Sequence, residues 1–104
     1  MEIKQLTEFS NAQRKKLMKY YSIKDENELT YPYMLKITEE VGELAEALLA
    51  LKALQREGKF EKKMDIGSEF ADVILTTFIL AGNLNINLEE ELKKKMEKIE
   101  KRYK

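Results

Sequence analysis

Two pairs of acidic residues have the spacing that metal-dependent chemistry needs. Glu40 and Glu43 lie three positions apart, at the edge of an apolar stripe that runs through residues 37–48. Residues three apart on a helix project the same way, so the oxygens of this pair can converge on one ion. Glutamates at a solvated helix edge have the same spacing, so this pair alone does not decide between the two interpretations.

The second pair lies in a far more apolar segment. Glu69 and Asp72 are also three apart, and nearly every residue after Glu69 in SEFADVILTTFILAG is apolar or small. Such a helix is expected to be enclosed on all sides, where an ionised carboxylate is costly unless a cation compensates it. No basic residue lies between Glu69 and Leu88. The compensating charge must come from another helix, another subunit or a bound metal.

A metal ion explains both pairs together. The sequence contains no cysteine and no histidine, which excludes disulfides, thiolate nucleophiles, Cys/His zinc sites and Ser-His-Asp catalysis. Four carboxylates from two facing helices make a hard-oxygen site that suits Mg²⁺, or Mn²⁺, better than Zn²⁺. Such a site also bridges naturally to the phosphates of a substrate.

The elements that position these acids are predicted to be four helices in one domain, residues 1–104. Glycines number four and prolines one, charged residues make up 37% and apolar residues 43%, which favours an all-α fold. Apolar periodicity and helix breakers predict helices at residues 7–21, 32–57, 65–84 and 88–103. Residues at the helix ends support these limits: Pro32 in a first turn, Thr30 as its cap, Gly58 as a stop, Asn85 in the left-handed conformation and Asn87 as an N-cap.

Charge and hydropathy narrow the possible partners. Nineteen basic and nineteen acidic residues give a net charge of zero, so no overall field favours nucleic acid or an anionic membrane. The chain shows neither the apolar core of a signal peptide nor a run near the roughly 20 residues of a membrane span, so a cytoplasmic location is expected. Four helices of this length cannot surround the apolar helix at 65–84. We therefore expect it to pack against its counterpart in a dimer or larger bundle.

The series Glu39-Glu40-x-x-Glu43 followed by Glu69-x-x-Asp72 resembles the signature of the MazG-like all-α nucleoside triphosphate pyrophosphohydrolases. The segments KITEEVGELAEAL and EFADVILTTFILAGNLNINL are similar to that family's second and third helices. The resemblance implies a four-helix MazG-like fold, a homodimer or homotetramer, and Mg²⁺-dependent cleavage of a nucleoside triphosphate (NTP or dNTP) between its α and β phosphates. It also implies site residues: Glu40, Glu43, Glu69 and Asp72 as metal ligands, and Glu39 to orient or deprotonate the attacking water or to hold a metal-bound water.

The last helix adds a further match. Many members have the pattern K-M-x-x-N-x-x-R-Y, and the corresponding run here is KMEKIEKRY. The resemblance implies that Lys95 and Arg102 neutralise phosphate charge, with Lys98 as a substitute where Ile99 replaces the family's asparagine. The alternative is that these are surface cations on a lysine-rich helix. Base selection in the family depends on the first helix and the following loop, where this chain offers Phe9, Asn11, Gln13, Tyr20, Tyr21, Tyr31 and Tyr33, although aromatic residues at helical spacing are more often core.

Two other functions remain open from the sequence. Phosphoribosyl-ATP pyrophosphatase shares the acidic architecture, but this chain lacks the histidine that this enzyme commonly has near ADVILTT. A catalytically silent helical dimerisation module needs no metal, because cations across the interface would match the buried acids. A melt with and without Mg²⁺ separates this module from an enzyme.

Overall fold

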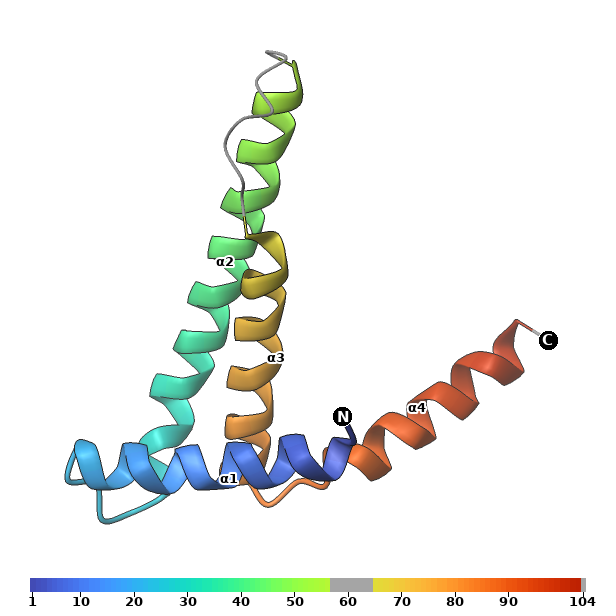
Figure 1. Ribbon diagram of the computed structural model, residues 1–104. Coiled ribbons are helices and arrows are strands. Elements are labelled where there is room, and N and C mark those ends of the chain that lie inside the picture. The colour runs from blue at the N-terminus through green and yellow to red at the C-terminus, as the bar shows by residue number, and fades with distance from the viewer. Residues whose placement is uncertain (57–64, 104) are drawn as a thin grey trace.

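The structure is a computed structural model, and it describes residues 1–56 and 65–103. Within these ranges it contains four helices and no strand, which confirms the all-α prediction: α1 Ile3–Tyr20, α2 Asn27–Arg56, α3 Ile66–Asn83 and α4 Leu88–Arg102. Figure 1 shows α2 and α3 side by side and antiparallel, with α1 crossing near one end of the pair and α4 leading away from it. The antiparallel pair α2–α3 is the part that carries the acidic motifs.

The predicted start of α1 was too late. The helix begins at Ile3 rather than residue 7, and the Glu2 backbone N–H donates to the Gln5 side chain at 2.7 Å. This reciprocal use of the N3 side chain satisfies one of the amide groups that a helix start leaves without a partner. Leu6 is buried, so the additional turn also contributes to the core.

The predicted start of α2, at residue 32, was wrong, because hydrogen bonding near Asp25 starts the helix earlier in the sequence. The helix begins at Asn27, whose backbone N–H donates to Asp25 Oδ1 at 3.0 Å. Pro32 lies inside the helix, beyond its first turn, so its missing N–H removes one backbone hydrogen bond from α2. Thr30 is not a cap, because it lies within the helix and its hydroxyl accepts a hydrogen bond from α3. The predicted end at residue 57 and the stop at Gly58 lie outside the described residues.

The turn between α3 and α4 follows the prediction. Asn85 has a φ of 56°, and the Ile86 N–H reaches back to the Ala81 carbonyl at 2.9 Å while the Asn85 N–H bonds Gly82 at 3.2 Å. This is the Schellman arrangement that ends a helix with a left-handed residue. Asn87 Oδ1 then accepts from the Glu90 N–H at 3.2 Å, so Asn87 is the N-cap of α4. The two helices meet at a bend of 114°.

The described residues leave much apolar surface uncovered. The radius of gyration is 17.1 Å, whereas a compact domain of this length has about 13 Å. Only Leu6, Leu29, Ile79 and Ala81 are buried apolar residues within the described ranges. The apolar helix α3 is covered by α2 and α1, yet Phe70 and Ile74 remain about half exposed. A single copy of the chain therefore does not enclose α3.

No single helix in the described ranges is long and apolar enough to cross a membrane. The pair α3 and α4 passes such a test only when the two bent helices are counted together.

Asn83 ties the end of α3 to the start of α2. Its side chain is buried, and its amide nitrogen donates to the Glu26 carbonyl at 2.9 Å and to Thr30 Oγ1 at 3.0 Å. We expect Asn83→Ala to lower the free energy of unfolding by about 1–3 kcal/mol, because buried partners lose their donor. Urea denaturation measures this, with Asn27→Ala as the control on an exposed side chain. Equal stability of both variants would show that the Asn83 hydrogen bonds do not stabilise the contact between α2 and α3.

Candidate metal centre

Three of the predicted metal ligands lie together between α2 and α3. Glu40, Glu43 and Glu69 each offer a carboxylate oxygen, and these oxygens lie within 4.8 Å of one another. The i, i+3 spacing places the first two on one side of α2, and the neighbouring α3 brings Glu69 opposite them. We call these residues the three-acid group. Its arrangement has the size of a site for a single cation or a pair of cations.

The three-acid group contains carboxylate oxygens that lack partners. Glu40 is only 6% exposed, and Oε2 of Glu40 and Oε2 of Glu69 are buried without a hydrogen-bond partner among the described residues. Buried carboxylate oxygens in proteins almost always have a donor or a cation. A divalent ion among the three acids would supply a partner for both oxygens, so the residues present fit the metal that the sequence pattern predicts.

The acids repel one another in the absence of a cation. The pKa of Glu43 is raised above its ordinary value of 4.5, first by the charge of Glu40, then by desolvation and by a side-chain hydrogen bond with Glu40, with the charges of Glu69 and Glu39 adding to the effect. A raised pKa means that the folded chain holds a proton more tightly than the unfolded chain does. The same repulsion is what makes the group attractive to a divalent cation.

This raised pKa gives a pH dependence with a definite sign. Its contribution to stability is complete below the unfolded pKa of Glu43 and is lost as the pH rises through the folded pKa. We therefore expect the metal-free chain to lose melting temperature modestly as the pH rises from below the ordinary pKa of Glu43 through its raised folded pKa. Mg²⁺ should remove the loss, since it stabilises the ionised acids. Melting curves across this pH range, with Mg²⁺ or with a chelator, measure the loss. If the melting temperature depends on pH in the same way under both conditions, the acids do not repel one another as described.

Among the described residues, the cation that pairs with the three-acid group comes from α2 itself. Lys36 Nζ lies 3.2 Å from Glu40 Oε1 and 3.6 Å from Glu39 Oε1. The carboxylates raise the pKa of Lys36, with the hydrogen bond to Glu40 as the main cause. Sequence reasoning missed this residue, although a lysine four positions before a glutamate is a recognisable helix pair. Glu39, the predicted water-orienting residue, is exposed beside it.

Asp72 is the one predicted ligand that the structure leaves outside the three-acid group. It is partly buried on α3, one turn after Glu69, and its backbone carbonyl accepts from Thr76 Oγ1 at 2.8 Å. Its spacing from Glu69 still places both residues on one side of the helix. Its role as a ligand stays a prediction.

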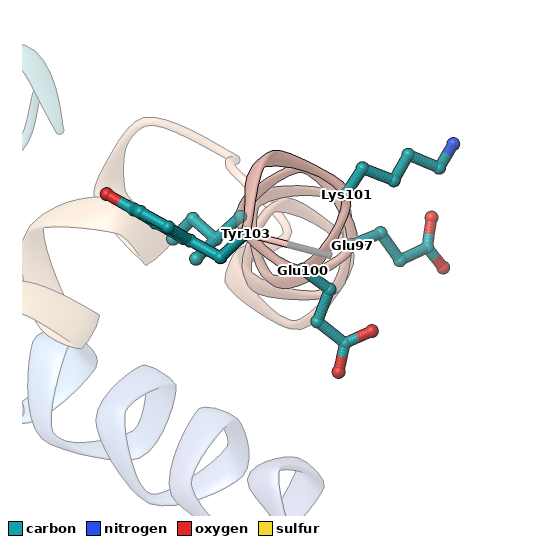
Figure 2. Close-up of a pocket in the computed structure, with 5 residues that line it drawn as sticks. Glu97, Glu100, Lys101 and Tyr103 are labelled. Carbon is teal, nitrogen blue, oxygen red and sulfur yellow. The ribbon is translucent and has the colours of Figure 1, made fainter.

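The predicted phosphate-binding cations lie apart from the acids within one chain. Lys95, Lys98 and Arg102 are exposed on α4, which Figure 1 shows leading away from the α2–α3 pair. Figure 2 views the end of α4, where Tyr103 points away from Lys101 and Glu97. The recess there is lined only by residues of this helix: Glu97, Ile99, Glu100, Lys101 and Tyr103. Because these side chains fan outward, they do not form a convergent binding site.

An apolar pocket shares one residue, Lys36, with the surroundings of the acids. It has a volume of about 430 Å³ and lies where the end of α1 and the following loop meet the first part of α2. Its lining consists of Leu17, Tyr21, Ile23, Leu29, Pro32, Tyr33 and Lys36. Burial raises the pKa of Tyr33. Lys36 therefore belongs both to this pocket and to the surroundings of Glu40.

Comparison with known proteins identifies one relationship. The family model of the MazG nucleotide pyrophosphohydrolase domain matches residues 29–104, a segment that contains all of α4 and the five predicted site acids, Glu39, Glu40, Glu43, Glu69 and Asp72. No curated protein and no solved structure gives a significant match.

Proposed function

Because the chain belongs to the MazG nucleotide pyrophosphohydrolase family, whose members hydrolyse phosphoanhydride bonds, we propose that it acts on nucleoside triphosphates with Mg²⁺. The proposed reaction cleaves an NTP or dNTP between the α and β phosphates and releases the monophosphate and pyrophosphate. Mn²⁺ is an acceptable replacement for Mg²⁺ at oxygen ligands. The observation that carries the proposal is the three-acid group with two buried oxygens that lack partners.

Glu40, Glu43, Glu69 and Asp72 are the residues that hold the divalent ion in this proposal. The ion, when bound, polarises the phosphoryl oxygens and neutralises their charge. Glu39 is exposed one position before Glu40, where its carboxylate can orient a water molecule and accept its proton as the water attacks phosphorus. The bond from phosphorus to the bridging oxygen breaks, and pyrophosphate or the monophosphate leaves with that oxygen.

The nucleoside fits the apolar pocket beside Lys36. Its volume of about 430 Å³ falls within the range of small-molecule pockets. Tyr21 and Tyr33 line it, and an aromatic ring offers a stacking surface to any base. These are two of the tyrosines that the sequence offered for base selection.

We further propose that the active form is a homodimer or homotetramer. The extended shape, with a radius of gyration of 17.1 Å, and the half-exposed Phe70 and Ile74 on α3 support this. Leu92, Met96 and Ile99 form an exposed apolar stripe on α4, which a second copy can cover. In such an assembly Lys95, Lys98 and Arg102 are free to reach the phosphates bound by another copy.

Product analysis tests the proposal. The protein is incubated with each NTP and dNTP and Mg²⁺, and the products are identified by chromatography, with a chelator as the control. We expect monophosphate and pyrophosphate from at least one nucleotide. Release of orthophosphate, or no turnover across the whole panel, would count against the proposed reaction.

A catalytically silent module is the alternative that one observation favours, because Lys36 already pairs with Glu40 and Glu39. This pairing leaves Glu69 Oε2 buried without a partner among the described residues, so a silent module requires a cation from a second copy at that oxygen. If Mg²⁺ leaves the melting temperature unchanged, the silent module is the better description.

A further inference from the structure

Lys36 contacts both parts of the proposed site, the three-acid group and the apolar pocket. Its ammonium group contacts Glu40 at 3.2 Å and Glu39 at 3.6 Å, and the same side chain lines the apolar pocket. Among the described residues, no other lysine or arginine lies within ion-pair distance of the three-acid group. Lys36 is therefore the only described cation that meets both the acids and the pocket.

The contact between Lys36 and Glu40 is unequal. The Glu40 side chain is 8% exposed, whereas the Lys36 side chain is 46% exposed. A lysine on a flexible stem gains little from such a half-exposed pair and can leave it for water or another anion. Glu40 cannot leave in the same way, because a buried carboxylate needs a replacement cation. A divalent ion bound to Glu40 supplies that replacement and repels the ammonium group.

If a nucleotide is bound, a Lys36 side chain displaced from Glu40 can contact a second anion, the phosphate chain. The divalent ion belongs to the acids and the nucleoside fits the pocket, so the phosphate chain that joins them passes the residue common to both. An ammonium group is a suitable point charge for phosphate oxygens. The displacement therefore turns the counter-ion of the metal-free site into a ligand for substrate.

We propose that Lys36 is a phosphate-binding residue that exchanges Glu40 for the phosphate chain of the nucleotide when the divalent ion enters. This inference rests on the proposed function. It differs from a purely structural role, in which Lys36 only holds Glu39 and Glu40 in place for the metal. The two roles predict opposite changes in metal affinity when the charge is removed.

Isothermal titration calorimetry separates the two roles. Mn²⁺ is titrated first into the metal-free protein, and pyrophosphate is then titrated into the protein saturated with Mn²⁺. For Lys36→Gln we expect Mn²⁺ to bind about two- to fivefold more tightly, since a competing cation is lost. Pyrophosphate should bind about tenfold more weakly, since a charged hydrogen bond is lost. Lys36→Arg should keep both affinities within about twofold.

Lys52→Gln is the matched control, because Lys52 is exposed on the same helix away from the acids. We expect it to match the wild type in both titrations. If Lys36→Gln weakens both Mn²⁺ and pyrophosphate binding, or behaves as Lys52→Gln does, the proposal that Lys36 exchanges Glu40 for phosphate is wrong. Failure of the proposed function has a different signature: the wild-type chain then binds no Mn²⁺ and hydrolyses no nucleotide, and the Lys36 proposal is overturned with it.

Discussion

Glu43→Gln is expected to lower kcat/KM for Mg²⁺-dependent hydrolysis at least about a hundredfold. Loss of a residue that only supports a metal ligand already costs about 10–100-fold, and Glu43 is assigned to the metal directly. The substitution keeps the shape of the side chain and removes its charge. Because Glu43 is exposed, the helical fold should remain intact.

The same variant has a second expected effect, in the opposite direction. The charge of Glu40 raises the pKa of Glu43, so removing the Glu43 charge relieves repulsion in the metal-free protein. We expect the melting temperature without metal to be equal to or above that of the wild type, while stabilisation by Mg²⁺ is reduced. Steady-state kinetics and thermal melts measure the two effects together.

Glu46→Gln is the control for Glu43→Gln. Glu46 is an exposed glutamate on the same helix, outside the three-acid group, and its substitution should leave activity within about twofold, as for a surface change away from the site. Full activity in Glu43→Gln would show that the three-acid group is not the metal site.

Asp72→Asn is also expected to reduce kcat/KM at least about a hundredfold. Mg²⁺ prefers an octahedral shell of oxygen ligands, and three carboxylates leave positions for a fourth. Asp72 is partly buried one turn beyond Glu69, on the same side of α3. We expect its carboxylate to turn towards the ion when the ion is bound, and the affinity for Mn²⁺ to fall with the activity.

Asp65→Asn provides the matched control for Asp72→Asn. Asp65 Oδ1 caps α3 by accepting from the Ser68 N–H at 2.9 Å, and asparagine caps a helix about as well as aspartate. This variant should keep the fold and the activity. Near wild-type activity and Mn²⁺ affinity in Asp72→Asn would limit the site to three carboxylates.

Local hydrogen bonding explains which parts of the fold the sequence predicts well. The turn at Asn85 and Asn87 depends on the left-handed conformation of one residue and the capping bond of the other, and both are properties of the residues themselves. The start of α2 was missed because Pro32 is compatible with more than one position near a helix start. The contact that uses Thr30 comes from Asn83, 53 residues away, which no local pattern contains.

The sequence predicts which residues form the site better than it predicts how their side chains are arranged. The spacing of Glu40 and Glu43 places both on one side of α2, and the packing of α3 beside α2 brings the Glu69 oxygen to them. The position of Asp72 depends on side-chain rotation, which residue spacing does not determine. Lys36 was overlooked because the search for a counter-ion concentrated on α3, whereas the pairing lies within α2.

The direction of α4 could not be predicted from local sequence. Its N-cap determines where the helix begins, but its apolar residues Leu92, Met96 and Ile99 remain exposed in a single copy of the chain. For this reason the proposed phosphate-binding roles of Lys95, Lys98 and Arg102 depend on the proposed oligomer.

Anomalous diffraction from crystals grown with Mn²⁺ tests the central claim most directly, because it locates the cation independently of activity. We expect at least one Mn²⁺ peak within coordination distance of the carboxylates of Glu40, Glu43 and Glu69. A structure without that peak, in which these carboxylates point apart into solvent or are each paired with a lysine or arginine, would contradict the metal site.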